Sequence, residues 1–103
     1  MVVASFIGRS GALEGFRVCG HSGYADAGQD IVCAAVSALT MYTANLLAEE
    51  FGLSCTVDVD EDSATISLFL EERAELGSKI LAAFKKELVA LAEEYPQNIL
   101  VKE

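Results

Sequence analysis

Apolar and polar residues alternate along two neighbouring stretches of the chain, 53–60 and 64–70, which are joined by the turn Glu61-Asp62-Ser63. Alternation with a period of two is typical of a half-buried strand. The two stretches therefore predict a hairpin with one apolar face, and Cys55, which lies on that face, is expected to be buried in the core.

Three other stretches also predict strands. Residues 2–8 and 13–20 are joined by a polar turn at 9–12 that contains a glycine, as in a second hairpin. Residues 99–101, Ile-Leu-Val, predict a short strand near the end of the chain.

Two longer segments predict helices. Residues 31–51 follow Asp30, a good N-cap residue, and end at Gly52, a typical C-terminal stop. Residues 74–95 carry apolar side chains at three- and four-residue spacing on one face, and Pro96 ends the pattern. The order β-β-α-β-β-α with a short final strand predicts an α/β fold of the α+β type, in which two helices pack on a small sheet within a single domain, 1–103.

The first helix is apolar on nearly every side, and residues 31–48 carry no charge over the length of a membrane span. Polar residues interrupt this stretch and no Lys or Arg flanks it, so we expect a buried helix of a soluble protein. The sheet can cover only one side. The second helix or another copy of the chain is expected to cover the rest, which favours a homodimer.

Composition excludes several classes of protein. The chain has 103 residues, of which 52% are hydrophobic and 22% charged, and this excludes a disordered chain. Its net charge of -9 leaves no basic surface for direct nucleic-acid binding, and it disfavours binding to acidic membrane surfaces. The three cysteines are odd in number and no signal peptide opens the sequence, so we expect a cytoplasmic protein.

The candidate chemistry lies around residues 19–37. His21 is the only histidine and follows a predicted strand, while Cys33 lies in the first turn of the first helix. A strand end and a helix start commonly meet at one edge of a sheet. Amides at a helix N-terminus favour the thiolate form of a cysteine, and a neighbouring imidazole can act as general acid. The pair therefore indicates nucleophilic catalysis. A cysteine that only fills apolar space, together with an ordinary surface histidine, would produce the same residue pattern.

A metal site is the weaker alternative. Cys19 and His21 lie two residues apart on a strand and share a face, so together with Cys33 they could ligate a metal. Structural zinc sites use four ligands, usually with paired cysteine knuckles, which this sequence lacks. We expect neither a metal nor another cofactor.

Two blocks of sequence resemble the signature of the ribosomal-processing cysteine protease Prp family. They are Gly-His-Ser at 20–22 and Gly-Gln-Asp-Ile-Val-Cys-Ala-Ala-Val-Ser at 28–37. The family is a small α/β dimer that removes the N-terminal extension of large-subunit ribosomal protein twenty-seven after a phenylalanine. By this resemblance Cys33 is the nucleophile and His21 its base. Ser22 departs from the pattern, because the family usually has alanine there.

The resemblance also bears on the neighbouring residues. Ser37 lies one helical turn after Cys33 and either supports the site or bonds to a carbonyl of its own helix. Asp30 fixes the helix start and has a possible second role in orienting His21. The polar loop between His21 and Asp30 is expected to close over the substrate, with contacts from Ser22, Gly23, Tyr24 and Gly28.

The charge pattern leaves two functions open. Between Val18 and Glu72 there are ten acidic residues and no Lys or Arg. Such a stretch is either an ordinary solvated surface or a field that attracts a basic partner. The leading hypothesis is an endopeptidase that acts on a basic ribosomal protein precursor. The alternative is a non-catalytic acidic module that assists the assembly of that protein.

Overall fold

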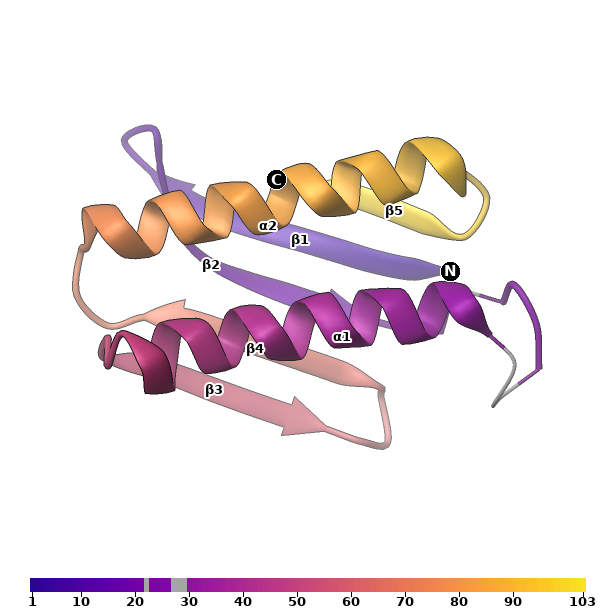
Figure 1. Ribbon diagram of the computed structural model, residues 1–103, viewed down its shortest axis with the longest axis horizontal. Helices are drawn as coiled ribbons and strands as arrows, with labels where there is room; N and C mark the ends of the chain where they lie inside the picture. Colours follow the sequence, from indigo (N-terminus) through magenta and orange to yellow (C-terminus); the bar gives the residue numbers. More distant parts are fainter. Residues whose placement is uncertain (22, 27–29) are drawn as a thin grey trace.

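The computed structural model describes residues 1–21, 23–26 and 30–103. Within these residues one five-stranded sheet carries both helices on the same face (Figure 1). The elements in chain order are β1 (Val2–Arg9), β2 (Ala12–Cys19), α1 (Ile31–Asn45) with its continuation η1 (Leu46–Glu50), β3 (Cys55–Asp60), β4 (Thr65–Leu70), α2 (Glu75–Glu94) and β5 (Ile99–Lys102). The predicted α+β fold, a sheet with two helices, is confirmed.

The sheet has the strand order β3-β4-β2-β1-β5. Neighbouring strands are antiparallel except β5, which pairs with β1 in parallel. The β1–β2 hairpin turns through Ser10 and Gly11, whose φ angles are 54° and 81°. Positive φ at both central residues is the type I′ geometry that matches the twist of a hairpin. β3 and β5 are consequently the two edges of the sheet.

Three aromatic rings form the centre of the layer between sheet and helices. Phe6 on β1, Phe16 on β2 and Phe84 on α2 are buried, and the Phe84 ring centroid lies 5.6 Å from that of Phe6 and 5.0 Å from that of Phe16. The rings meet edge to face, which is a favoured arrangement of their quadrupoles. This cluster fixes α2 over the middle of the sheet.

Helix α1 is buried along one face only. Val32, Val36 and Thr40 lie on that face, while Ile31 and Tyr42 point outward with 57% and 65% of their surface exposed. By length and composition the helix Ile31–Glu50 could cross a membrane, but core helices of soluble proteins meet the same criterion. The expectation of a helix covered on most sides is therefore only half met by this chain alone.

The first helix ends where the sequence predicts. Gly52 has a φ of 61°, and the amide of Leu53 donates to the carbonyl of Leu47 across 2.9 Å. A left-handed glycine followed by such a bond is a common C-terminal cap. The last turn, Leu46–Glu50, widens into a π-helix, which the sequence pattern does not predict.

The predicted burial of Cys55 is wrong. Cys55 is only half-buried, and two further residues on its face, Val57 and Val59, are 42% and 59% exposed. The alternation is real, but β3 is an edge strand. β3 lies at the edge of the sheet (Figure 1), and most of its side chains are exposed.

Candidate active site

The start of α1 is fixed by Asp30, as predicted. The Asp30 backbone is extended, and its carboxylate accepts a hydrogen bond from the backbone amide of Cys33 across 2.9 Å. The Asp30 carbonyl accepts from the amide of Ala34 across 3.1 Å. This cap places Cys33 at the third position of the helix, where its half-buried side chain leaves the first turn.

The same bonds determine which amides of the first turn are available to a substrate. Because Asp30 engages the amides of Cys33 and Ala34, these two cannot also hold an oxyanion. The amides of Ile31 and Val32 are out of reach of any intrahelical carbonyl. They are therefore the first-turn amides that no helix carbonyl engages, although neither Ile31 nor Val32 lines the cleft.

Gly20 positions the histidine. Its φ is 94°, and its amide donates to the carbonyl of Ala64 on the β4 side across 3.2 Å. A Cβ at this position would lie 2.5 Å from the carbonyl oxygen of Met1, so only glycine fits. The chain thus leaves β2 in a conformation set by close backbone packing, and His21 follows directly at the surface.

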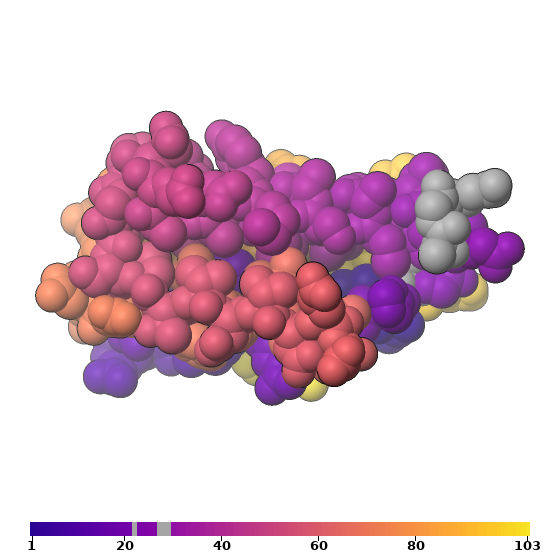
Figure 2. All heavy atoms as spheres, turned by 90° about the horizontal axis from the view of Figure 1, so that it is seen from below, coloured from indigo at the N-terminus to yellow at the C-terminus, as the bar shows by residue number. Residues whose placement is uncertain are grey.

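One cleft of about 300 Å³ brings together three of the predicted site residues. Its lining includes Cys33 and Ser37 from α1 and His21 from the end of β2. The hollow between the N-terminal half of α1 and the β3–β4 turn is visible in Figure 2. A nucleophile candidate and a base candidate therefore share one solvent-open space.

Ser37 differs from the two threonines that follow it in the helix. The hydroxyls of Thr40 and Thr43 donate to the carbonyls of Val36 and Leu39 across 2.6 and 2.7 Å. Ser37 forms no such bond with any residue that the structure describes. Its hydroxyl is exposed at the cleft and is available to a substrate, which favours the site interpretation over the backbone one.

The opposite wall of the cleft comes from β3 and its turn, which the sequence pattern does not connect with the site. Val59, Asp60 and Glu61 face the same space as Cys33. Asp60 also orders the turn, since its carboxylate accepts from the amide of Asp62 across 3.0 Å. The acidic run 58–62 was the available signal, but only the structure shows that it shares a cleft with α1.

The predicted substrate loop is placed only in part. Gly23 and Tyr24 are exposed but do not line the cleft, whereas Ser22 and Gly28 lie outside the described residues. Tyr24 packs edge to face on Tyr95 at the end of α2, with ring centroids 5.5 Å apart. In this structure Tyr24 therefore links the loop to α2.

The other two cysteines do not line the cleft. Cys19 is half-buried on β2, and burial, followed by the nearby Glu71 carboxylate, raises the pKa of the Cys55 thiol above its ordinary value. In the ranges 1–21, 23–26 and 30–103 no three His, Cys, Asp or Glu side chains are grouped to hold a metal ion. Cys33 is thus the cysteine that shares a cavity with His21.

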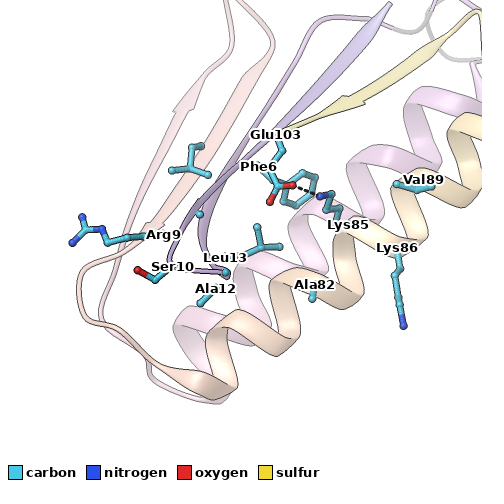
Figure 3. Close-up of a pocket in the computed structure, with 13 residues that line it drawn as sticks. Phe6, Arg9, Ser10, Ala12, Leu13, Ala82, Lys85, Lys86, Val89 and Glu103 are labelled. Carbon is cyan, nitrogen blue, oxygen red and sulfur yellow. Dashed lines mark hydrogen bonds and ion pairs between the residues drawn. The ribbon is translucent and has the colours of Figure 1, made fainter.

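A larger cavity of about 880 Å³ lies at the other end of β1 and β2. Figure 3 shows Phe6, Leu13 and Ala82 along it, with Lys85 paired to Glu103. The Lys85 Nζ and a Glu103 carboxylate oxygen are 2.8 Å apart. We call this cavity the basic groove, because Arg9, Lys85 and Lys86 line it. It contains neither histidine nor cysteine.

The chain resembles known proteases in sequence and in fold. A family model described as cysteine protease Prp matches residues 1–100. The fold superposes on the ribosomal processing protease Prp of S. aureus, solved with a covalently linked product peptide, with a TM-score of 0.91, 21% identity and full coverage of both chains. It also matches SMU.848 of Streptococcus mutans with a TM-score of 0.85 and 34% identity, over 99% of this chain and 92% of that one.

A further structure of the S. aureus protease, bound to a substrate peptide, matches with a TM-score of 0.86 and 20% identity over the whole of both chains. No curated protein sequence matches the chain. The family model nevertheless spans nearly the whole sequence. The chain therefore belongs to the cysteine protease Prp family.

Proposed function

We propose that this protein is a cysteine endopeptidase that removes the short N-terminal extension of a large-subunit ribosomal protein. The observation that carries the proposal is the shared cleft, which Cys33 enters from a capped helix start and His21 from the end of β2. The relatives described as ribosomal processing proteases support the substrate class.

The proposed reaction begins with transfer of the Cys33 thiol proton to the His21 imidazole. The thiolate sulfur attacks the scissile carbonyl carbon, and amides at the start of α1 near Cys33 stabilise the oxyanion that forms. His21 then donates its proton to the leaving amine, the C–N bond breaks, and a thioester to Cys33 remains. His21 next removes a proton from water, which attacks the thioester and releases the carboxylate product and the Cys33 thiol.

Asp30 and Ser37 have supporting roles in this proposal. Asp30 holds the first turn of α1 so that Cys33 faces the cleft. Ser37 offers a hydroxyl to the substrate one turn away. Ser22, where the family usually has alanine, adds a hydroxyl to the methyl side chain and leaves the proposed mechanism unchanged.

We further propose that the protein is a homodimer and that it acts in the cytoplasm. The outer face of α1 exposes three large apolar side chains, Ile31, Met41 and Tyr42. A second copy that packs on this face of α1 would cover these side chains. Sedimentation at micromolar concentration is expected to show a dimer, and a monomer alone would contradict this part.

The test of the catalytic proposal is incubation with a ribosomal protein that carries the extension, read by intact mass. The expected result is a shortened product, together with an enzyme species heavier by one acyl group when the reaction is stopped early with acid. The alternative function, a non-catalytic acidic binding module, predicts a complex with the same protein but neither mass change.

A further inference from the structure

Strand β3 forms one edge of the sheet and is the least covered of its strands. All of its residues except Cys55 are exposed. Figure 2 looks toward this edge, with α1 above it. A free edge presents unpaired backbone groups that can bond to an added strand.

The hydrogen-bond register shows which groups of β3 are free. The amide of Glu71 donates to the carbonyl of Ser54 across 2.9 Å, and the pairing continues without a bulge from Cys55 opposite Leu70. In an antiparallel pair, bonded and non-bonded positions alternate. Asp58 therefore bonds to β4, whereas the amides and carbonyls of Val57 and Val59 point outward.

This edge leads directly into the active-site cleft. Val59 belongs to β3, and with Asp60 and Glu61 it lines the wall opposite Cys33. An extended chain bonded to the outer side of β3 would continue past these residues toward Cys33. The other edge strand, β5, contributes no residue to the cleft.

The side chains of β3 suit an extended peptide. Val57 lies opposite Leu68, which is fully buried beneath the helices, so Val57 and Val59 face the helix side of the sheet. Their exposure of 42% and 59% leaves apolar surface for alternate side chains of an added strand. Main-chain bonds with side-chain contacts at every second residue are the recurring mode of strand addition.

The charge of β3 and its turn determines which kind of polypeptide can bind to this edge. Residues 55–64 contain four acids, Asp58, Asp60, Glu61 and Asp62, and no base. The same edge of a second copy would carry the same four acids, so edge-to-edge pairing of two copies is opposed. A basic extended polypeptide is attracted instead.

We propose that the free edge of β3 is the docking strand for the substrate. The extended basic polypeptide adds to the sheet beside Val57 and Val59, and its scissile bond enters the cleft at Cys33. This inference rests on the proposed protease function and adds to it the surface that aligns the substrate.

Amide exchange tests the docking directly. The probe is a synthetic peptide with the cleavage sequence followed by basic residues, added at saturation to the Cys33→Ala variant, which cannot cleave it. The amides of Val57 and Val59 are expected to exchange at least about tenfold more slowly when they become bonded. The amide of Asp58, already bonded to β4, is the internal control and is expected to keep its rate.

A pair of substitutions at one position separates backbone from side chain. Val57→Pro removes an outward amide without breaking a bond to β4, whereas Val57→Ala keeps the amide and shortens the side chain. We expect Val57→Pro to raise KM by about tenfold with little change in kcat, and Val57→Ala to raise it by less than about threefold. If Val57→Pro does not fold, the exchange experiment decides alone.

Two results separate the docking from the function. Cleavage of the same peptide by the wild-type protein, without slower exchange at Val57 and Val59 in Cys33→Ala, would overturn the docking strand and leave the protease intact. Equal KM values for folded Val57→Pro and Val57→Ala would overturn it as well. Absence of cleavage by the wild-type protein would overturn both.

Discussion

The cleft at Cys33 and the basic groove lie at opposite ends of β1 and β2 and differ in size, charge and chemistry. The groove encloses about 880 Å³ and the cleft about 300 Å³. The groove is lined by three cations and the cleft by none. Only the cleft combines a thiol with an imidazole, because a helix start and a strand end meet there. Size alone would point to the groove, at the end of the molecule away from Cys33 and His21.

The two regions also differ in how their shape is fixed. At the groove, Lys85 pairs with Glu103 and its Nζ lies 6.0 Å from the centre of the Phe6 ring. These are contacts of a long side chain that can rearrange. At the cleft, Asp30 bonds to the backbone of Cys33, and Gly20 packs on the backbone of Met1. Reactive groups held by backbone contacts are suited to catalysis, which demands precise placement.

The largest expected effect is on activity. Cys33→Ala removes the nucleophile and His21→Ala the base, and each is expected to lower kcat/KM by at least about a thousandfold while the protein stays folded. Lys86→Ala in the basic groove and Cys19→Ser on β2 are the matched controls and should stay within about twofold of wild type. Peptide-cleavage kinetics would measure this. Turnover retained by Cys33→Ala would rule out the proposed mechanism. Loss of activity in Lys86→Ala would show that the two cavities do not differ in their importance for cleavage.

The next effect is on stability, at one glycine from each region. Gly20 and Gly11 both have positive φ, but only at Gly20 would a Cβ meet backbone, whereas nothing lies within 4 Å of a Cβ at Gly11. We expect Gly11→Ala to cost about 1 kcal/mol of unfolding free energy and Gly20→Ala more than about 2 kcal/mol. Urea denaturation would compare them. Equal losses would show that the backbone at the cleft adapts.

A smaller effect is expected at the helix cap. Asp30→Ala removes the acceptor of the Cys33 amide and should cost about 1 kcal/mol of unfolding free energy, whereas Asp30→Asn keeps an oxygen there and should cost less than about 0.5 kcal/mol. If capping is the whole role of Asp30, Asp30→Asn also keeps its activity. A stable Asp30→Asn variant that cleaves slowly would instead assign the carboxylate charge to the orientation of His21.

Local sequence predicts much of this molecule because most of the signals are local. The cap at Asp30, the stop at Gly52 and the position of Cys33 in the first turn each depend on residues within a few positions of one another. Alternation likewise predicts the β3–β4 hairpin. These parts of the fold and site need no knowledge of the strand order.

The parts that the sequence misses depend on contacts between distant residues. The exposure of Cys55 follows from the position of β3 at the sheet edge, and the cleft wall at Asp60 follows from the placement of that edge beside α1. The contact of Tyr24 with Tyr95 joins a loop to the end of the last helix. A periodic pattern contains no information about which elements become neighbours.

The smallest expected effect concerns the opposite charges of the two regions. If Asp60, Glu61 and the other acids around the cleft attract a basic substrate, salt should screen that attraction, since the Debye length is about 10 Å at 0.1 M. We expect kcat/KM for the full basic ribosomal protein to fall several-fold between about 0.05 and 0.5 M salt, mainly through slower association. A neutral peptide with only the cleavage sequence should respond far less. Alkylation of Cys33 by a small neutral reagent controls for salt effects on the thiol itself. Equal salt dependence of kcat/KM for the protein and the peptide would show that the acidic residues are only an ordinary solvated surface. The proposal of a protease would then depend on Cys33 and His21 alone.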